Sequence, residues 1–254
     1  MTINKEMLLD GKTALITGAS GDLGIATLEA LVSMGANIVA HYYSDRNKLR
    51  LDKVVKTLQS KGYPCINYQS DLRSEDEVKA LFYEAINIFK GIDIVINTAG
   101  TMLKQNLQDT TLEDYENIFD IHSKGAFLVL RQAARCLNNN GRIINISSSL
   151  TLISGAPQYS VYAAAKAASE QLTKYLASEI GHRGITVNTV SPGPLDNEFL
   201  RSEENEQSLQ FLASLSPFSR LGDVSDITPV IQLLVSENAR WITGQNIRVN
   251  GGIV

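Results

Sequence analysis

Two side chains of this sequence are suited to proton transfer by their types and spacing. Tyr162 and Lys166 open an alanine-rich stretch, and on a helix residues four apart share one face, about one turn apart. A nearby ammonium group favours the phenolate, so it lowers a tyrosine pKa that is normally about 10. The same spacing arises by chance in many amphipathic helices, so the pair needs support from the rest of the chain.

Hydroxyl groups precede this pair in the sequence. The apolar run 141–146 is typical of a buried strand, and it leads into Ser147, Ser148 and Ser149. A serine at the end of such a strand could hydrogen-bond the phenol oxygen of Tyr162.

A glycine-rich turn follows the first apolar run of the chain. Residues 12–17 are β-prone, residues 18–24 form the turn, and a helical stretch, 25–34, precedes a second strand at 37–42. This order is the βαβ fingerprint of a dinucleotide site, where glycines allow the backbone to approach a pyrophosphate. The N-terminus of the helix supplies N–H donors and positive potential for phosphates.

Strands and helices alternate along the whole chain. Expected strands are 12–17, 37–42, 65–69, 92–96, 141–146, 185–191 and 246–249, and expected helices are 25–34, 46–61, 74–89, 111–137, 159–180 and 223–236. This alternation predicts an α/β fold, a Rossmann-type doubly wound parallel sheet, in a single domain over 1–254. Residues 195–221 interrupt it after the carboxyl end of a strand, which predicts a substrate lid; a surface helical excursion is the alternative.

Composition excludes several classes of function. With 44% hydrophobic residues and a net charge of −4, the chain is typical of a globular protein, and nothing in its charge suggests a surface for nucleic acid or anionic membranes. Cys65 and Cys136 lack metal-binding spacing and indicate a reducing compartment, and the three histidines are scattered, so we expect no metal site. We see no leader segment and no apolar run near about 18 residues, so we expect a cytoplasmic protein.

Motifs at characteristic spacings identify a family. They are the 18–24 turn, Asp71-Leu72, Asn97-Thr-Ala-Gly100, Ser148, Tyr162-Ala-Ala-Ala-Lys166, Val187-Asn-Thr-Val-Ser-Pro192-Gly193 and Thr243-Gly244 with Asn250-Gly-Gly. From Lys12 to Gly252 the chain resembles the single-domain short-chain dehydrogenases/reductases. It is similar in particular to the 3-oxoacyl-[acyl-carrier-protein] reductase-like members.

The resemblance implies hydride transfer between a nicotinamide cofactor and a carbonyl/alcohol substrate. Tyr162 would be the general acid, Lys166 would lower its pKa and hold the nicotinamide ribose, and Ser148 would orient the substrate oxygen. Strand alternation would turn Ser147 and Ser149 the other way. Besides Tyr162 and Lys166, the implied cofactor-binding residues are Gly18, Ser20, Gly21, Asp22, Leu23, Gly24, Tyr42, Ser44, Arg46, Asp71, Leu72, Asn97, Ala99, Gly100, Pro192 and Gly193.

Three residues depart from the family pattern. Asp22 stands where the turn usually has its middle glycine, and its carboxylate would repel phosphates unless it points outward or caps the helix. His122 stands in the place of a catalytic asparagine; a histidine could relay protons, or it could simply be packed between helices. Thr98 replaces a second asparagine, which is a mild change.

The end of the second strand bears on the choice of nucleotide. NAD users usually carry an acidic residue there to bind the ribose 2′-hydroxyl, but this sequence has Tyr42. Ser44 and Arg46 could hold a 2′-phosphate, whereas Asp45 and Asp22 argue mildly against one. We therefore expect NADP(H), with NAD possible.

The identity of the substrate is left open by the sequence. The residues expected near the pocket are mainly apolar: Leu103, Leu152, Ile153, Tyr159, Pro194, Leu195 and Phe199. The alternatives to a reductase are an NAD-linked alcohol or sugar dehydrogenase and a catalytically weak nucleotide-binding sensor or scaffold. By resemblance we expect a homotetramer formed through two long helices and the last strand.

Overall fold

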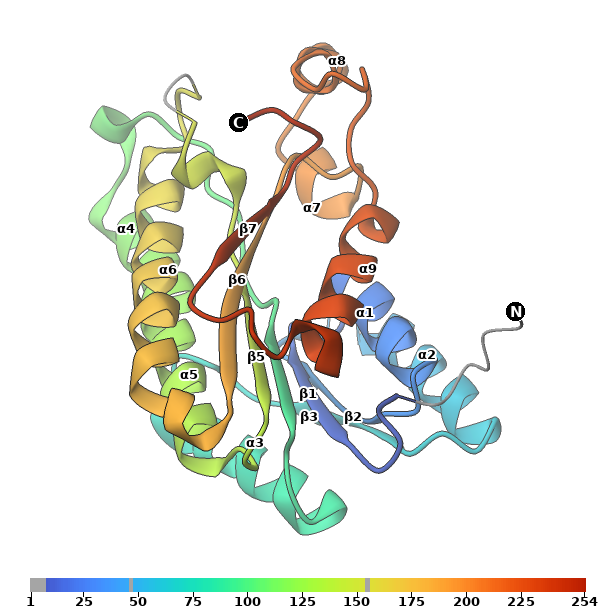
Figure 1. Cartoon of the computed structure of the whole chain (residues 1–254). Helices are drawn as coiled ribbons and strands as arrows, with labels where there is room; N and C mark the ends of the chain where they lie inside the picture. Colours follow the sequence, from blue (N-terminus) through green and yellow to red (C-terminus); the bar gives the residue numbers. More distant parts are fainter. Residues whose placement is uncertain (1–7, 46–47, 154–155) are drawn as a thin grey trace.

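The computed structural model describes residues 8–45, 48–153 and 156–254. Within them, seven parallel strands form one sheet in the order β3-β2-β1-β4-β5-β6-β7 (Figure 1). The strands are β1 (Thr13–Thr17), β2 (Asn37–Tyr42), β3 (Cys65–Gln69), β4 (Ile94–Asn97), β5 (Arg142–Ile146), β6 (Thr186–Pro192) and β7 (Asn246–Val249). The predicted doubly wound sheet is confirmed.

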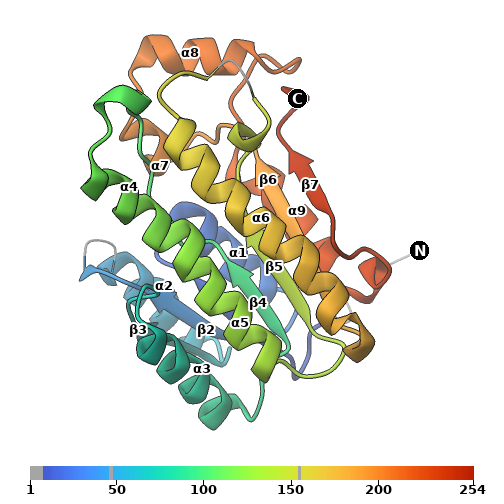
Figure 2. The ribbon, with the colours of Figure 1, turned by 90° about the vertical axis from the view of Figure 1, so that its left-hand side faces the viewer.

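Helices cover both faces of the sheet (Figures 1 and 2). On one face lie α1 (Asp22–Val32), α2 (Lys48–Ser60) and α9 (Val224–Val235), and on the other α3 (Glu75–Phe89), α5 (Ala126–Cys136) and α6 (Ser160–Ile180). Successive side chains of β1 point to opposite faces of the sheet and so contribute to both cores. Ala14 and Ile16 belong to the core beneath α1, α2 and α9, and Leu15 belongs to the core beneath α3, α5 and α6. A single domain results.

The predicted long helix 111–137 is wrong in one respect. It begins as expected with a capping box between Thr111 and Asp114, at the start of α4 (Leu112–Phe119). A π-helical segment, Asp120–Gly125, then separates α4 from α5 and carries His122. One extra residue per turn changes which side chains face the sheet, so this segment alters the direction of every residue in it.

The two ends of the expected lid meet beside the sheet. Leu195 and Gly222 form a parallel bridge, and Gly222 N–H donates to Pro194 O over 2.9 Å. Between them lie two short helices, α7 (Glu198–Arg201) and α8 (Glu206–Ser214). We call residues 195–221 the lid; in Figure 2 it lies beyond the upper ends of the strands.

No helix among residues 8–45, 48–153 and 156–254 is both long and apolar enough to span a membrane.

Candidate active site

A cavity of about 700 Å³ opens at the carboxyl ends of the strands. It lies where the strand order reverses between β1 and β4, which is where ligands of open α/β sheets bind. Its walls include the glycine turn after β1, the ends of β4, β5 and β6, the first turns of α6, and the lid. Motifs far apart in the sequence are therefore brought to one site.

Tyr162, Ser148 and Lys166 come together in this cavity. Tyr162 and Lys166 lie on one face of α6, both almost fully buried, and Ser148 at the end of β5 hydrogen-bonds the Tyr162 phenol. The Lys166 Nζ lies 6.0 Å from the centre of the Tyr162 ring and donates to Ile146 O over 2.8 Å. This arrangement can hold a substrate oxygen and deliver a proton to it.

The neighbouring serines bond elsewhere. Ser147 Oγ donates to Glu170 Oε1 over 2.5 Å, and Ser149 Oγ donates to Ser191 O over 3.3 Å. Ser148 is therefore the serine of this group that bonds to Tyr162, as strand alternation predicts.

The expected direction of the Tyr162 pKa shift is wrong for the protein alone. Burial raises the pKa of Tyr162 and outweighs the lowering effect of the Ser148 hydrogen bond. Burial also lowers the pKa of Lys166 to about 8, against the opposing charge of Glu170. Because desolvation penalises the charged form of each group, Tyr162 remains a protonated phenol at neutral pH.

The glycine turn has the shape of a phosphate cradle. Gly18 has φ +64°, and a Cβ there would lie 2.7 Å from the Ala99 Cα; a Cβ on Gly24 would lie 2.3 Å from Gly18 O. Only glycine fits both positions. The first N–H groups of α1 have no carbonyl partner within their helix, and the residues at this end of the helix, 20–24, line the cavity. The residues fit the pyrophosphate of a dinucleotide.

Asp22 points its charge away from this cradle. Its Oδ1 accepts from Arg50 Nη1 over 2.5 Å, and its Oδ2 accepts from the backbone N–H of Glu198 over 3.0 Å. The carboxylate is thus paired with a cation of α2 and attached to the first residue of α7. Because the Asp22 carboxylate is paired in this way, it repels phosphates less than an unpaired carboxylate would.

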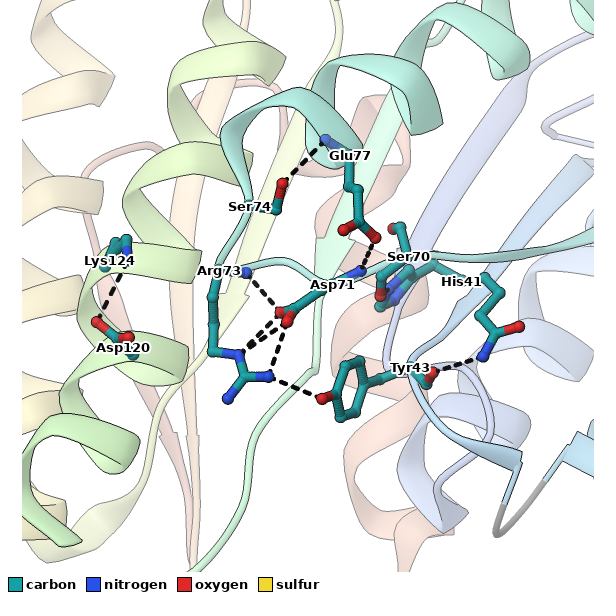
Figure 3. A network of polar contacts seen from close by, with 10 residues as sticks. His41, Tyr43, Ser70, Asp71, Arg73, Ser74, Glu77, Asp120 and Lys124 are labelled. Atoms are coloured by element: carbon teal, nitrogen blue, oxygen red, sulfur yellow. Dashed lines mark hydrogen bonds and ion pairs between the residues drawn. The ribbon is translucent and has the colours of Figure 1, made fainter. Parts of the chain in front are cut away.

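A polar network marks the side of the cavity formed by the ends of β2 and β3 (Figure 3). Asp71 accepts from Arg73 at both oxygens, over 2.7 to 3.0 Å, and Arg73 Nη2 also donates to Tyr43 Oη over 2.7 Å. Beneath them His41 Nε2 bonds Ser70 O over 2.8 Å, and its Nδ1 accepts from Gly18 N–H over 3.1 Å. Tyr43, Arg50 and Arg73 line the cavity.

Sequence reasoning missed those three residues. The signal for Arg73 was its place two residues after Asp71, and the signal for Tyr43 was its place directly after the strand. Neither type of residue is unusual in a turn, so the pattern alone did not single them out.

Most residues predicted to bind cofactor line the cavity. They are Gly18, Ser20, Gly21, Asp22, Leu23, Gly24, Ser44, Asp71, Leu72, Ala99, Gly100, Tyr162, Lys166, Pro192 and Gly193. Of the expected pocket residues, Ile153, Tyr159, Pro194, Leu195 and Phe199 line it, and Leu103 and Leu152 do not. Arg46 lies outside the described residues.

Tyr42 and Asn97, which the sequence predicted to bind cofactor, do not line the cavity. Tyr42 is buried in the core, because the last residue of β2 faces the helix layer, and Tyr43 takes its place at the cavity. Asn97 is buried and ties three strands together: it accepts from Thr17 Oγ1 over 2.7 Å and donates to Asn145 Oδ1 over 2.8 Å. It does not line the cavity.

His122 lies behind the site and does not line the cavity. Its Nε2 bonds Thr101 O over 2.6 Å, and its ring packs edge-on against Tyr162 with centres 5.2 Å apart. Burial, helped by the charge of Lys166, lowers the pKa of His122 to about 3. A neutral ring that bonds the Thr101 carbonyl and packs against Tyr162 agrees with the packed alternative.

Comparison with known proteins gives consistent matches. The family model described as Enoyl-(Acyl carrier protein) reductase matches residues 18–254. Versicolorin reductase stcU of Emericella nidulans is 35% identical over 99% of each chain.

Solved structures share the fold closely. A blue fluorescent protein from a metagenomic library, in complex with NADPH, superposes with a TM-score of 0.92 at 32% identity, over 97% of this chain and 99% of that one. A putative dehydrogenase from Burkholderia cenocepacia with bound NADP gives a TM-score of 0.92 at 31% identity, over 99% and 96%. This chain belongs to the short-chain dehydrogenase/reductase family of oxidoreductases.

Proposed function

We propose that this enzyme is an NADP(H)-dependent reductase of a carbonyl compound with a large apolar portion. The observation that carries the proposal is the buried Ser148–Tyr162–Lys166 set, which opens into the cavity beside the phosphate cradle. NADPH, when bound, supplies the hydride for the carbonyl carbon.

The chain's own residues hold the substrate oxygen and protonate it. Ser148 donates a hydrogen bond to that oxygen and orients it toward the phenol. Tyr162 gives its proton to the oxygen as negative charge develops there. The raised pKa of Tyr162 keeps the phenol protonated at neutral pH, and the protonated phenol is the form that acts as the acid in reduction.

Lys166 restores the proton and positions the nucleotide. Its ammonium is anchored to Ile146 O, and its pKa of about 8 lies closer to neutral pH than that of an ordinary lysine. We assign to it the ribose hydroxyls, as the family resemblance implies. His122 has a structural role in this proposal, as the support of the Tyr162 ring.

The preference for NADP(H) rests on the residues around the adenosine end. Ser44, Arg50 and Arg73 line that part of the cavity and offer a hydroxyl and two guanidinium groups for a 2′-phosphate. The structurally similar proteins that hold NADPH or NADP support the same choice. NAD use is the alternative.

The apolar substrate class rests on the opposite wall. Its side chains include Leu150, Ile153, Leu195, Phe199, Leu212 and Leu215. Such a wall suits a fatty or ring-containing carbonyl compound better than a sugar. A 3-oxoacyl thioester remains within this class, and the similarity to a versicolorin reductase supports a ring-containing ketone as well.

Assembly and location extend the proposal. Phe127 on α5 and Tyr175 on α6 are exposed aromatic residues, which suits a homotetramer formed through these helices and the edge strand β7. The free thiols Cys65 and Cys136 support a reducing compartment such as the cytoplasm.

The test is a titration with NADPH and NADH, followed by a panel of carbonyl compounds that includes an acetoacetyl thioester, a bicyclic aromatic ketone and a keto sugar. We expect tighter binding of NADPH and its oxidation by an apolar member of the panel. Binding without oxidation across the panel would favour a sensor or scaffold. NADH-linked oxidation of an alcohol or sugar would favour the dehydrogenase alternative.

A further inference from the structure

The lid contains a carboxylate that is almost fully buried. Glu204 lies between α7 and α8, and only 3% of its side chain is exposed, whereas its lid neighbours Glu203 and Glu206 are exposed. A charged group is buried only where partners replace its water, since desolvation of an unpaired carboxylate is costly. The partners of Glu204 therefore show what the lid is built to contact.

Both oxygens of Glu204 are engaged by residues outside the lid. Lys104 Nζ donates to Oε2 over 2.6 Å, and the Tyr159 hydroxyl donates to Oε1. Lys104 belongs to the loop after β4, and Tyr159 directly precedes α6. We call Lys104, Tyr159 and Glu204 the lid triad; it joins the lid to two other segments that approach the cavity.

Tyr159 connects this triad to the reacting centre. It lies three residues before Tyr162, so both rings are on the same side of the first turn of α6, and both line the cavity. Because its hydroxyl is directed to Glu204, Tyr159 presents its ring to the cavity. The Gln105 N–H also donates to Gln158 O over 2.7 Å, which holds the Lys104 loop against the segment carrying Tyr159.

The surroundings of Glu204 and Tyr159 shift their pKa values in opposite directions. Burial would raise the pKa of Glu204, but hydrogen bonds from Lys104, Ser208 and Tyr159 outweigh it and lower this pKa. Burial and the Glu204 carboxylate both raise the pKa of Tyr159. At neutral pH the triad is thus an ion pair with a neutral phenol donor, and Tyr159 is not a second catalytic acid.

We propose that Glu204 is a positioning residue that holds the lid closed and fixes the Tyr159 ring as the apolar wall against which the substrate carbonyl compound is seated beside Tyr162. The effect on substrate binding rests on the proposed function, whereas the effect on lid opening does not. We expect cofactor binding to change little when the triad is altered, because the hydrogen bonds that join its three residues do not involve the glycine turn or the Tyr43–Arg73 network.

The test compares Lys104→Met, Glu204→Gln and Tyr159→Phe with Glu206→Gln, a matched change at an exposed lid carboxylate. Hydrogen–deuterium exchange of residues 198–214 reports lid opening. Because Lys104→Met leaves a buried carboxylate without its cation, we expect exchange there to accelerate by about tenfold or more, with a smaller change in Glu204→Gln and none in Glu206→Gln. Exchange in the sheet serves as the control for folding.

Steady-state kinetics then test positioning. We expect Lys104→Met and Tyr159→Phe to raise the substrate KM by about tenfold, to change kcat by less than about threefold and to leave the Kd of NADPH unchanged. Lys104→Arg should restore most of the KM because it restores the cation. The double variant Lys104→Met/Glu204→Gln carries no unpaired charge and should fold even if Lys104→Met does not.

Two outcomes would overturn the proposal. One is lid exchange in Lys104→Met and Glu204→Gln that matches the wild type and Glu206→Gln. The other is a loosened lid with an unchanged KM, which would remove the positioning role. If the wild-type protein reduces no carbonyl compound, the proposed function fails, but the exchange comparison still decides whether Glu204 holds the lid.

Discussion

The two walls of the cavity are held in place in different ways. The cofactor wall consists of turns at the ends of β1, β2 and β4, and the ladder hydrogen bonds of the sheet fix its backbone. The lid wall includes two short helices with exposed aromatic residues, Phe199 on α7 and Phe211 on α8. Besides the backbone bridge between Leu195 and Gly222 at its ends, it is attached through hydrogen bonds at Asp22 and at the lid triad. One wall is set by the fold and the other by a few polar contacts.

This difference predicts separable functions. A change in the cofactor wall should weaken nucleotide binding through the backbone. A change at the reacting centre or the lid should weaken catalysis while the nucleotide still binds.

The largest expected effect is at the reacting centre. Tyr162→Phe removes the proton donor and keeps the ring, so we expect the rate of the chemical step to fall by about 10²- to 10⁴-fold. The Kd of NADPH should change little. Single-turnover reduction under saturating NADPH measures the rate, and nucleotide fluorescence measures the Kd. A variant that retained its turnover would assign the proton donor to another group.

A second prediction concerns His122, whose ring packs edge-on against Tyr162. The pKa of His122 is lowered from 6.5 to about 3, so below pH 6.5 the unfolded chain binds a proton that the folded chain does not. The contribution of His122 to the free energy of unfolding is complete above pH 6.5. It falls by about 1.4 kcal/mol per pH unit as the pH drops toward 3. His41, with a pKa lowered to about 4, adds a similar loss.

Urea unfolding between pH 7 and pH 4.5 measures this slope. We expect His122→Asn to have a clearly shallower slope than the wild type, and His182→Asn, at an exposed histidine, to keep the full slope. Equal slopes in all three proteins would mean that His122 takes up its proton over the same pH range in the folded and the unfolded chain, which would contradict its burial as a neutral ring.

A third prediction tests whether the cofactor wall depends on its backbone. Gly18→Ala combines a positive φ with a Cβ only 2.7 Å from Ala99, whereas Gly62→Ala has a positive φ with nothing within 4 Å. We expect about 1 kcal/mol of lost stability at Gly62, from backbone strain alone. At Gly18 the further clash should also displace the turn and weaken NADPH by about tenfold or more. Calorimetry of NADPH binding and thermal unfolding give both quantities.

If Gly18→Ala bound NADPH normally, the close approach of the turn to the end of β4 would not matter for the nucleotide. If Gly62→Ala weakened NADPH binding equally, the loss in both variants would come from lower overall stability.

The same contrast explains what could be predicted from the sequence. The sheet, the glycine turn and the Tyr162–Lys166 pair depend on local spacing, and each appears where the sequence predicted it. Glu204 pairs with a lysine 100 residues away, and Asp22 bonds the backbone of Glu198. Such contacts depend on how the lid folds back, which hydrophobic periodicity does not specify. The excursion at residues 195–221 was predicted but its attachments were not, and its role as a substrate lid stays a prediction.

The direction of side chains at element ends was the other weak point. Tyr42 and Tyr43 are adjacent and chemically alike, and successive residues of a strand point to opposite sides, so the choice between them decides between core and cavity even though the end of β2 was predicted correctly. His122 shows the same sensitivity, because the π-helical segment sets its direction and a regular helix was predicted there.

The smallest expected effect concerns the part of the cofactor wall that is proposed to bind the 2′-phosphate. Arg73→Ala removes a cation held by Asp71 and Tyr43, and we expect it to weaken NADPH by about tenfold, since a charge-assisted hydrogen bond at a partly exposed site is modest. NADH, which lacks the 2′-phosphate, should lose less. Arg240→Ala, at an exposed arginine that does not line the cavity, is the control for net charge. Equal losses for both nucleotides would show that Arg73 supports the adenine through Asp71, and the preference for NADP(H) would then rest on Ser44 and Arg50.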